Sequence, residues 1–538
     1  MIQVNLNRQC FQYDVHSLVR AFYPGEEVRV DCTQRESDGT NPLPTDGELF
    51  FLRVAFVPDC VETADQCSQI QISLCVNSEE RLHMEGSCLE AERHETKNEL
   101  KRLLYRLLSD YSGRTLPWGN LTGIRPTKIP MALLNQGWKN SAIADYMRST
   151  YYTSNEKTAL AIAIANRERY LLEKLELNQE SAAGHLDESE PLSAPGFTQT
   201  DVPDHPESTE GCAADPFWNG YSLYIGIPFC PSICLYCSFS SSPIALWKNQ
   251  VDAYLDTLLY EMELVAKLLP GRGPDTVYIG GGTPTTLEPE QMERLLSKIE
   301  ACFDLSRTRE FTVEAGRPDS ISREKLAVLK KHGITRISIN PQTMNQETLD
   351  FIGRKHTVEE TEEAFALARE MGFTNINMDL IVGLPGEGAP EVEHTMQVLS
   401  GMTPDSITVH SLAVKRAARL RLFREEHKEL TFENSSAIMD MTAAYTRKAG
   451  LYPYYLYRQK NMAGNFENVG YAREGCEGLY NILIMEEIQT ILALGAGAST
   501  KLVYPGNRIS RVENVKDIKN YMERIDEMIE RKRAGLYG

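Results

Sequence analysis

The spacing of apolar and polar residues divides the chain into regions with different repeat lengths. Near the amino terminus, several short runs alternate apolar and polar residues, which is typical of half-buried strands. Farther along, the period becomes helical, and SNEKTALAIAIANRERYLLEKLEL (154–177) predicts one long helix that starts at a serine. Residues 1–179 are therefore predicted to form an α+β module. Its expected strands are 1–6, 26–32, 49–57 and 69–76, and its expected helices are 15–23, 94–111 and 154–177.

Residues 180–216 have the composition of a linker. Between Glu180 and Asp215 there are nine acidic residues and no lysine or arginine, and four prolines interrupt the stretch. Because it holds few large apolar residues, it cannot bury enough surface to offset the entropy cost of folding. We predict a disordered acidic linker here.

After the linker, strand-like and helix-like runs alternate through residues 217–412. Six β–α steps predict a parallel sheet with helices outside, and six is fewer than the eight of a complete barrel. The predicted fold class is α/β, with a partial (β/α)6 TIM-like barrel, although a doubly wound sheet would give the same one-dimensional pattern. Residues 413–538 are expected to form an α+β extension. The predicted barrel strands are 222–229, 275–281, 309–315, 334–340, 375–383 and 406–414.

Polar, glycine and cysteine residues collect where these predicted strands end. In a parallel barrel the chemistry lies at the carboxyl ends of the strands, so these residues are expected to meet at one edge. One polar residue at the end of a strand needs no explanation, because loops are polar. Polar, glycine or cysteine residues at the ends of all six predicted strands do need one. The set comprises Cys230, Cys234, Cys237, Gly280, Gly281, Gly282, Thr283, Glu314, Asn340, Gln342, Asp379, His410 and Ser411.

Composition and charge narrow the class of protein. The net charge of -19 argues against a nucleic-acid partner, which would require a basic surface. No run of about 18 apolar residues is present, and MIQVNLNRQC at the start does not resemble a secretory signal. We therefore expect a cytoplasmic enzyme without a membrane span, whose twelve cysteines stay reduced.

The segment CPSICLYC (230–237) concentrates three of those cysteines. Chance is a poor explanation for so tight a group. A structural zinc site takes four ligands, and apart from these three no Cys or His lies between residues 213 and 301, so a fourth ligand would have to come from farther away. An iron–sulfur cubane has four irons and is held by thiolates, so three cysteines leave one iron open to a substrate. We favour the cluster.

Several segments carry a family resemblance. CPSICLYC resembles the CxxxCxxC motif of the radical S-adenosylmethionine (SAM) superfamily, in which SAM chelates the open iron. YIGIPFCPSICLYCSF, YIGGGTPTTL, VEAGRPDS, INPQTMNQETL, IGRKHT and NMDLIVGLPGE resemble, in order, segments of the oxygen-independent coproporphyrinogen III oxidase family. The resemblance covers about residues 217–500. The long α+β region before the barrel is similar to the HemZ-type branch, coproporphyrinogen dehydrogenase.

The resemblance implies cofactors and the residues that hold them. A 4Fe-4S cluster would be bound by Cys230, Cys234 and Cys237, and SAM would bind beside it. Asp379 would accept hydrogen bonds from ribose hydroxyls, and Arg354 would fork onto the SAM carboxylate. No protein residue is implied as catalytic, because the radical is generated from SAM. The implied SAM contacts are Tyr224, Tyr236, Gly281, Gly282, Thr283, Glu314, Gln342, Arg354, Asp379 and Ser411.

The implied activity is the oxidative decarboxylation of coproporphyrinogen III to protoporphyrinogen IX, with a low-potential electron donor such as flavodoxin or ferredoxin. The basic segment KRAARLRLFR (415–424) would suit a substrate with four carboxylates, but an ordinary solvated helix face explains it as well. Tyrosines in the last region would suit an apolar ring pocket or simple core packing. These four tyrosines are Tyr452, Tyr454, Tyr455 and Tyr457.

Two departures from the family pattern leave the substrate open. Well-established oxidases carry a further cysteine two positions after the third, where Phe239 stands here, as in the related haem-chaperone branch. Gly226 replaces a signature histidine. Three hypotheses follow: a decarboxylating dehydrogenase, a haem-binding and transfer protein, and a radical SAM enzyme that acts on haem itself.

Overall fold

The structure, a computed structural model, describes most of the chain as two compact units. The first comprises the described part of Met1–Ala165, and the second comprises the described residues after Ala165 apart from Phe466, which belongs to the first. The predicted linker falls almost entirely outside the described residues, as does the basic segment 415–424. The described residues are 1–24, 26–32, 50–58, 67–77, 79–89, 93–123, 125–175, 215–239, 241–269, 271–413, 434–458 and 466–537.

The first unit is built on a five-stranded sheet, with strand order β2-β1-β3-β4-β5. Its buried core is formed by apolar residues such as Val4, Leu18, Leu52 and Leu104, which come from both strands and helices. The strands are β1 (Ile2–Leu6), β2 (Val28–Cys32), β3 (Phe51–Pro58), β4 (Cys67–Val76) and β5 (Glu79–Leu89), and the helices are α1 (Gln12–Phe22), α2 (Arg93–Ser112), α3 (Lys128–Asn135), α4 (Asn140–Tyr151) and most of α5 (Asn155–Lys174).

Strand β5 and helices α3 and α4 were not predicted from the sequence. In β5, charged residues occupy most of the solvent-facing positions and Gly86 interrupts the apolar positions, so the strand lacks the apolar run used to recognise its neighbours. It nevertheless pairs with β4 along most of its length. Pairing with β4 therefore stabilises β5 as a strand, even though its own sequence has only a weak strand pattern.

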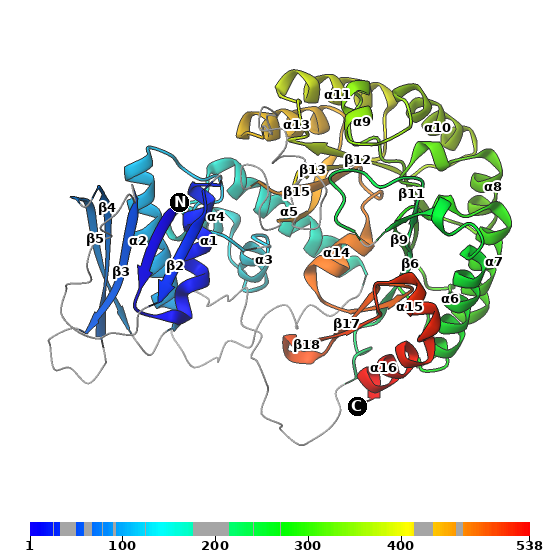
Figure 1. Cartoon of the computed structure of the whole chain (residues 1–538), viewed down its shortest axis with the longest axis horizontal. Coiled ribbons are helices and arrows are strands. Elements are labelled where there is room, and N and C mark those ends of the chain that lie inside the picture. The colour runs from blue at the N-terminus through cyan, green and yellow to red at the C-terminus, as the bar shows by residue number, and fades with distance from the viewer. Residues whose placement is uncertain are drawn as a thin grey trace. The chain divides into compact units, whose positions relative to one another are not determined.

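The second unit contains an eleven-stranded sheet, with strand order β14-β15-β13-β12-β11-β10-β9-β6-β16-β17-β18. Within it, β6 and the strands from β9 to β13 lie in sequence order and are parallel (Figure 1). A doubly wound sheet would reverse its strand order partway, so the predicted partial (β/α)6 barrel is confirmed. The barrel strands are β6 (Tyr221–Ile227), β9 (Thr276–Gly281), β10 (Glu310–Glu314), β11 (Arg336–Ser338), β12 (Ile376–Val382) and β13 (Ser406–Ser411).

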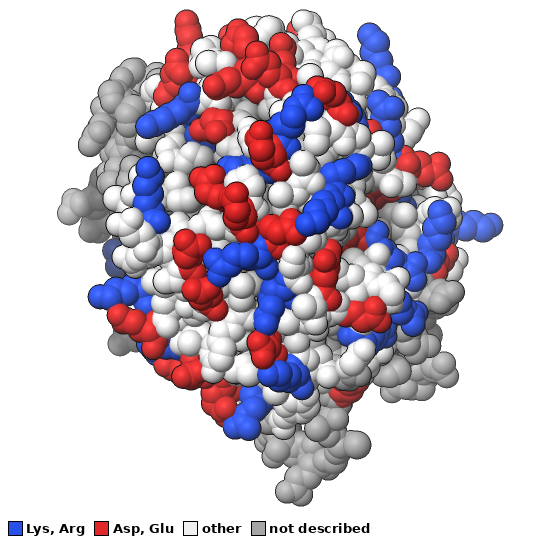
Figure 2. Space-filling model, turned by 90° about the vertical axis from the view of Figure 1, so that its right-hand side faces the viewer, with Lys and Arg blue, Asp and Glu red and all other residues white. Residues whose placement is uncertain are grey.

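Helices lie between successive barrel strands and form the outer wall in Figure 1. Their exposed surfaces carry ion pairs between neighbouring helices, such as Arg294 of α7 with Asp252 of α6 at 3.1 Å. Figure 2 shows that acidic and basic side chains are interspersed on the face it presents. The connecting helices are α6 (Val251–Ala266), α7 (Pro289–Cys302), α8 (Arg323–Lys331), α9 (Gln346–Phe351), α10 (Val358–Glu370) and α11 (Ala389–Met402).

The carboxyl-terminal region adds strands at both edges of the barrel sheet. β16 (Thr490–Leu494) pairs in parallel with β6 and so extends the barrel, which the sequence analysis did not predict. Antiparallel strands then continue the sheet on each side. These are β17 (Ser499–Val503) and β18 (Ile509–Glu513) on one side, and β15 (Asn468–Ala472) and β14 (Tyr452–Tyr457) on the other.

Candidate functional site

The three cysteines lie in one loop that follows β6, at the carboxyl end of the barrel. Within this region β7 (Phe229–Cys230) pairs in parallel with β8 (Ser242–Pro243), so the two ends of the cysteine loop lie side by side. The loop is also tied to a segment more than a hundred residues away, because the Leu235 N–H donates to the Ile352 carbonyl at 3.0 Å. The backbone of the loop is thus held at both its ends and its middle.

The cysteine side chains influence one another. Burial raises the pKa of the Cys230 and Cys237 thiols, and the neighbouring Cys234 raises both further. Cys230 accepts a hydrogen bond from Thr283 Oγ1 at 3.6 Å, and Cys234 accepts one from Arg317 Nη1 at 3.7 Å. The loop therefore brings the three sulfurs together in a partly buried place with donors already present.

The glycines after β9 let the chain pass directly beneath the cysteine loop. Gly281 has a φ of +106°, which a residue with a side chain rarely adopts. A Cβ atom on Gly282 would lie 2.8 Å from the Ile227 carbonyl oxygen and closer still to that of Phe229. The N–H groups of Gly282 and Thr283 donate to those same two carbonyls, each at 2.7 Å. These residues therefore fix the position of the cysteine loop.

Glu314 lies at the end of β10, under a stack of tyrosines. Tyr278 donates a hydrogen bond from its hydroxyl to Glu314 Oε1 at 2.5 Å, and its ring stacks on Tyr480 at a centroid distance of 4.4 Å. Tyr224 stacks on the same pair at 6.2 and 6.3 Å. Burial raises the pKa of Glu314 to about 7, although the Tyr278 hydroxyl and the Gly281 N–H oppose the rise. Glu314 can thus change its charge near neutral pH.

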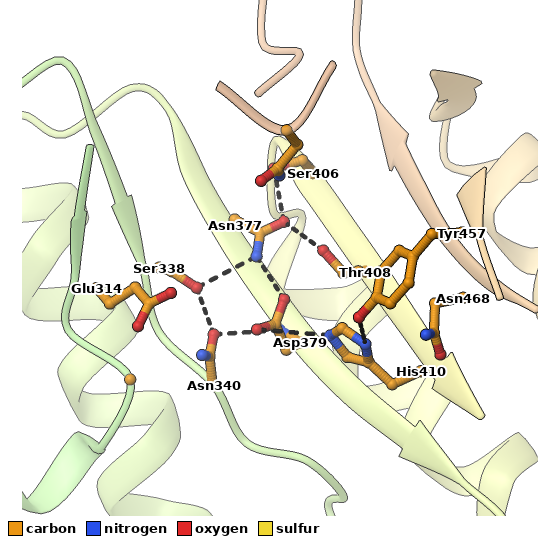
Figure 3. A network of polar contacts seen from close by, with 12 residues as sticks. Glu314, Ser338, Asn340, Asn377, Asp379, Ser406, Thr408, His410, Tyr457 and Asn468 are labelled. Atoms are coloured by element: carbon orange, nitrogen blue, oxygen red, sulfur yellow. Dashed lines mark hydrogen bonds and ion pairs between the residues drawn. The ribbon is translucent and has the colours of Figure 1, made fainter. Parts of the chain in front are cut away.

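Asn377 on β12 is the centre of a polar network inside the barrel (Figure 3). Its Nδ2 group donates to Asp379 Oδ1 at 2.7 Å and to Ser338 Oγ at 3.2 Å. Its Oδ1 atom accepts from the hydroxyls of Ser406 and Thr408 at 3.0 and 3.2 Å. One amide therefore ties three strands together and orients the carboxylate of Asp379.

Asp379 faces His410 across the same network (Figure 3). Its Oδ2 atom lies 3.8 Å from His410 Nε2, and His410 Nδ1 lies 3.4 Å from the Tyr457 hydroxyl. Burial raises the pKa of Asp379, but hydrogen bonds and the charge of His410 outweigh it, so the pKa is lowered overall. Asp379 is thus held as a carboxylate, unlike Glu314.

Gln342 has a strained backbone and an unused acceptor. Its φ is +71°, which is uncommon for a residue with a side chain. Its N–H donates to the Asp379 carbonyl at 3.0 Å, and its own carbonyl accepts from the Ile381 N–H at 2.8 Å. The buried Oε1 atom has no hydrogen-bond partner among the described residues. A buried, unpartnered acceptor on a strained residue makes Gln342 a candidate for ligand binding.

Arg354 lies beneath the cysteine loop and is almost fully buried. Its Nη2 group donates to the carbonyls of Asn340 and Gly316 at 2.6 and 2.9 Å, and its Nη1 group donates to the Tyr236 hydroxyl at 3.0 Å. These contacts join the cysteine loop to two barrel strands. The resemblance implied that Arg354 binds the SAM carboxylate through two parallel hydrogen bonds. Some of the hydrogen bonds to Asn340, Gly316 and Tyr236 would have to break for those two bonds to form.

Ser411 is engaged away from the network. Its N–H donates to Asn468 Oδ1 at 2.8 Å, and its hydroxyl donates to the Glu467 carbonyl at 2.9 Å. Successive residues of a strand point to opposite faces, and the preceding His410 points into the barrel. The structure therefore does not bring the Ser411 side chain together with the other predicted contacts.

The opposite end of the barrel interior is closed by α14 (Leu479–Glu486). Glu310 on β10 accepts a hydrogen bond from the Leu479 N–H at 2.6 Å, so a buried carboxylate sits at the amino end of this helix. Arg336 on β11 donates to Ser406 Oγ at 3.0 Å nearby. Both charged side chains are thus hydrogen-bonded within the protein, although the buried Arg336 Nε has no hydrogen-bond partner among the described residues.

The polar face of the barrel strands was not predicted from the sequence. Polar residues were expected at strand ends, yet they also occupy alternate positions along whole strands. This period of two was available as a signal in the strand sequences. The overlooked residues include Ser222, Thr276, Tyr278, Glu310, Thr312, Arg336, Ser338, Asn377, Ser406 and Thr408.

The four tyrosines of β14 are divided between core and site. Tyr454 and Tyr455 are buried in an apolar cluster, and Tyr452 is exposed. Tyr457 contacts His410, and Tyr455 is hydrogen-bonded to the side chain of Thr408. Tyr455 and Tyr457 therefore reach the polar network, and core packing accounts for Tyr454.

Comparisons with known proteins agree with this geometry. Residues 224–399 match the family model of the radical SAM superfamily. The oxygen-independent coproporphyrinogen-III oxidase-like protein HemZ of Bacillus subtilis is 40% identical over 442 residues, which cover 81% of this chain and 80% of that protein. The heme chaperone HemW of the same bacterium is 34% identical over 314 residues, covering 57% of this chain and 76% of HemW. The solved coproporphyrinogen III oxidase HemN of Escherichia coli has a TM-score of 0.47 at 25% identity, covering 58% of this chain and 70% of that one.

A cysteine triplet after the first strand of a partial barrel, together with the family match, defines a radical SAM protein, whose cofactors are a 4Fe-4S cluster and SAM. The chain belongs to the oxygen-independent coproporphyrinogen III oxidase family, in the group that includes HemZ and HemW. None of the helices that the structure describes is long and apolar enough to cross a membrane.

Proposed function

We propose that the protein is an oxygen-independent coproporphyrinogen III oxidase, which decarboxylates coproporphyrinogen III to protoporphyrinogen IX with a low-potential electron donor. The proposal rests on one observation above others. A loop of three thiols lies beside a buried set of acceptors at the carboxyl end of a partial barrel, in a chain that is 40% identical to HemZ over most of both lengths.

The proposed cluster ligands are Cys230, Cys234 and Cys237. Their fit is supported by their mutual electrostatic influence and by the donors already aimed at two of the sulfurs. When bound, the cluster and SAM would supply radical chemistry directed at a propionate side chain of the substrate. The protein's own residues must bind, orient and shield these groups.

The acceptors inside the barrel are proposed to hold SAM. Asp379, which stays ionised, and Glu314 would accept hydrogen bonds from ribose hydroxyls, and the unpartnered Oε1 atom of Gln342 would accept from an amine or hydroxyl. Tyr224 and Tyr236 would contribute ring surfaces, while Gly281, Gly282, Thr283 and Arg354 shape the loop. Ser411 is omitted from this set, because its hydroxyl is already bound to the backbone.

The proposal can be tested on anaerobically reconstituted protein. It is incubated with SAM, a reductant and coproporphyrinogen III, and the products are analysed for the tripropionate intermediate and protoporphyrinogen IX. Both should form, and Cys230→Ala, Cys234→Ala and Cys237→Ala should abolish SAM cleavage. Cleavage of SAM without decarboxylation would show that the substrate assignment is wrong.

A haem-binding and transfer function is the second candidate. Phe239 replaces the fourth cysteine of the oxidases and is 72% exposed, and the chain matches 76% of HemW. An exposed aromatic ring beside the cluster loop suits contact with a flat macrocycle. Stoichiometric haem binding without any decarboxylated product would favour this function over the first.

A further inference from the structure

Arg317 is a buried arginine that contacts the cysteine loop from the end of β10. Only 3% of its surface is exposed. Its Nη1 group donates one hydrogen bond to Cys234 Sγ at 3.7 Å and another to Ser232 Oγ at 3.2 Å. One of the three cluster-binding cysteines therefore has a positively charged donor directed at its sulfur.

Asp319 fixes the direction of this guanidinium group. Arg317 Nε donates to Asp319 Oδ1 at 3.1 Å, and Nη2 donates to Asp319 Oδ2 at 3.0 Å. A guanidinium group is rigid and planar, so this two-bond fork on one edge turns the Nη1 edge toward the cysteine loop. The turn itself is held, because Ser320 Oγ donates to the Arg317 carbonyl at 2.7 Å.

The donor to Cys230 is of a different kind. Thr283 offers a neutral hydroxyl to the Cys230 sulfur at 3.6 Å. Hydrogen bonds from charged donors are about twice as strong as those from neutral ones. The donors to Cys237 are neutral as well, namely the Phe239 N–H and the Ser241 side chain. Among the three cysteines, Cys234 is therefore the one whose hydrogen-bond donor is charged and at which the protein can most strongly influence the charge carried by the cluster.

We propose that Arg317 raises the reduction potential of the cluster through its hydrogen bond to Cys234 Sγ, and that Asp319 aims and partly offsets it. The inference rests on the proposed function in requiring a cluster at the three cysteines. Reduction takes one electron from the low-potential donor and forms or breaks no bond. The added negative charge is shared by the sulfurs, so a positive donor stabilises the reduced state more than the oxidised one.

The test is the midpoint potential of the reconstituted cluster in the full chain, without SAM, read from the EPR signal of the reduced cluster at a series of applied potentials. Arg317→Gln removes the charge. It should lower the equilibrium constant for reduction about tenfold, which is a shift of about 59 mV to more negative potential. Asp319→Asn removes the opposing charge and should shift the potential in the positive direction.

Arg323→Gln is the matched control. Arg323 lies on α8, is exposed, and pairs with Glu370 at 2.9 Å away from the cysteines. This substitution should leave the potential unchanged. If the Arg317→Gln variant does not retain the cluster, the Arg317→Lys variant is measured instead. Lysine keeps the positive charge but cannot make the two parallel hydrogen bonds to Asp319. A smaller shift of the same sign is then expected.

Opposite shifts in the Arg317 and Asp319 variants would support the proposal. If Arg317 and Asp319 had a purely structural role, their substitution would lower the iron content without shifting the two midpoint potentials in opposite directions. Unchanged midpoint potentials in both variants would overturn the inference. An unaltered chain that binds no cluster would overturn the proposed function together with this inference. An active, cluster-bearing protein whose potentials do not move would overturn this inference alone.

Discussion

Glu314 is the residue whose charge we expect to control SAM binding near neutral pH. Burial raises the pKa of its carboxyl group to about 7. A protonated carboxyl group accepts hydrogen bonds less well than a carboxylate, and ribose hydroxyls need acceptors. A raised pKa means that the neutral form predominates below pH 7. SAM affinity is therefore expected to rise as the pH rises through 7 and to fall as it is lowered.

The size of this effect follows from the pKa. With a value of about 7, roughly 9% of Glu314 is ionised at pH 6 and roughly 91% at pH 8. A ligand that binds only one form has an apparent Kd equal to the intrinsic Kd divided by the fraction of that form. The Kd for SAM should therefore be about tenfold higher at pH 6 than at pH 8.

Calorimetry of SAM binding to reconstituted protein at pH 6, 7 and 8 measures this directly. Glu314→Gln removes the ionisation, so comparison with this variant cancels the titration of SAM itself. Tyr278→Phe removes the hydroxyl that donates to Glu314 at 2.5 Å, which should raise the pKa of Glu314 further. At pH 8, the Tyr278→Phe variant should then bind SAM with lower affinity than the unaltered protein does.

The pH dependence can also contradict this reasoning. If the unaltered protein and Glu314→Gln show the same ratio of Kd values between pH 6 and pH 8, Glu314 does not titrate in this range or does not contact SAM. An unchanged affinity of Glu314→Gln for SAM at pH 8 would show that the carboxylate charge of Glu314 contributes nothing to SAM binding.

Three further substitutions probe the scaffold. Lys532→Met leaves the fully buried Glu261 without its partner at 2.7 Å and should destabilise the second unit by about 3–5 kcal/mol in denaturant unfolding. Gly282→Ala pushes a methyl group against the carbonyls beneath the cysteine loop, so iron bound per chain should fall by more than half while circular dichroism is unchanged. Gln342→Gly relieves the positive φ and should raise stability by about 1 kcal/mol, while SAM binding weakens.

Each of these substitutions has a control or a contrary outcome. Lys519→Met alters an exposed lysine and should change stability by less than about 0.5 kcal/mol. Gly401→Ala adds a methyl group where no atom lies within 4 Å, and it should keep its iron. Equal iron in both glycine variants would refute the role of the close approach, and an undiminished SAM affinity in Gln342→Gly would refute the ligand role of its side chain.

Local patterns in the sequence determined the class of fold and the position of the cysteine loop. The barrel strands and helices were predictable because side-chain period depends only on neighbouring residues. The three cysteines at 230, 234 and 237 were predictable for the same reason, since a short loop holds them together whatever surrounds it. Gly333, with a φ of +66°, stands just after α8, and the preference for glycine at such a position is likewise local.

Only the tertiary structure decided which distant residues meet. β16 joins β6 across more than 260 residues, and Arg317 reaches Cys234 across 83. Asn377 became the centre of a network because strand pairing aligned its neighbours. Ser411 was turned away because adjacent strand residues face opposite sides. Contacts of this kind depend on strand order and register, which result from the packing of the whole sheet and leave no mark on the spacing of nearby residues.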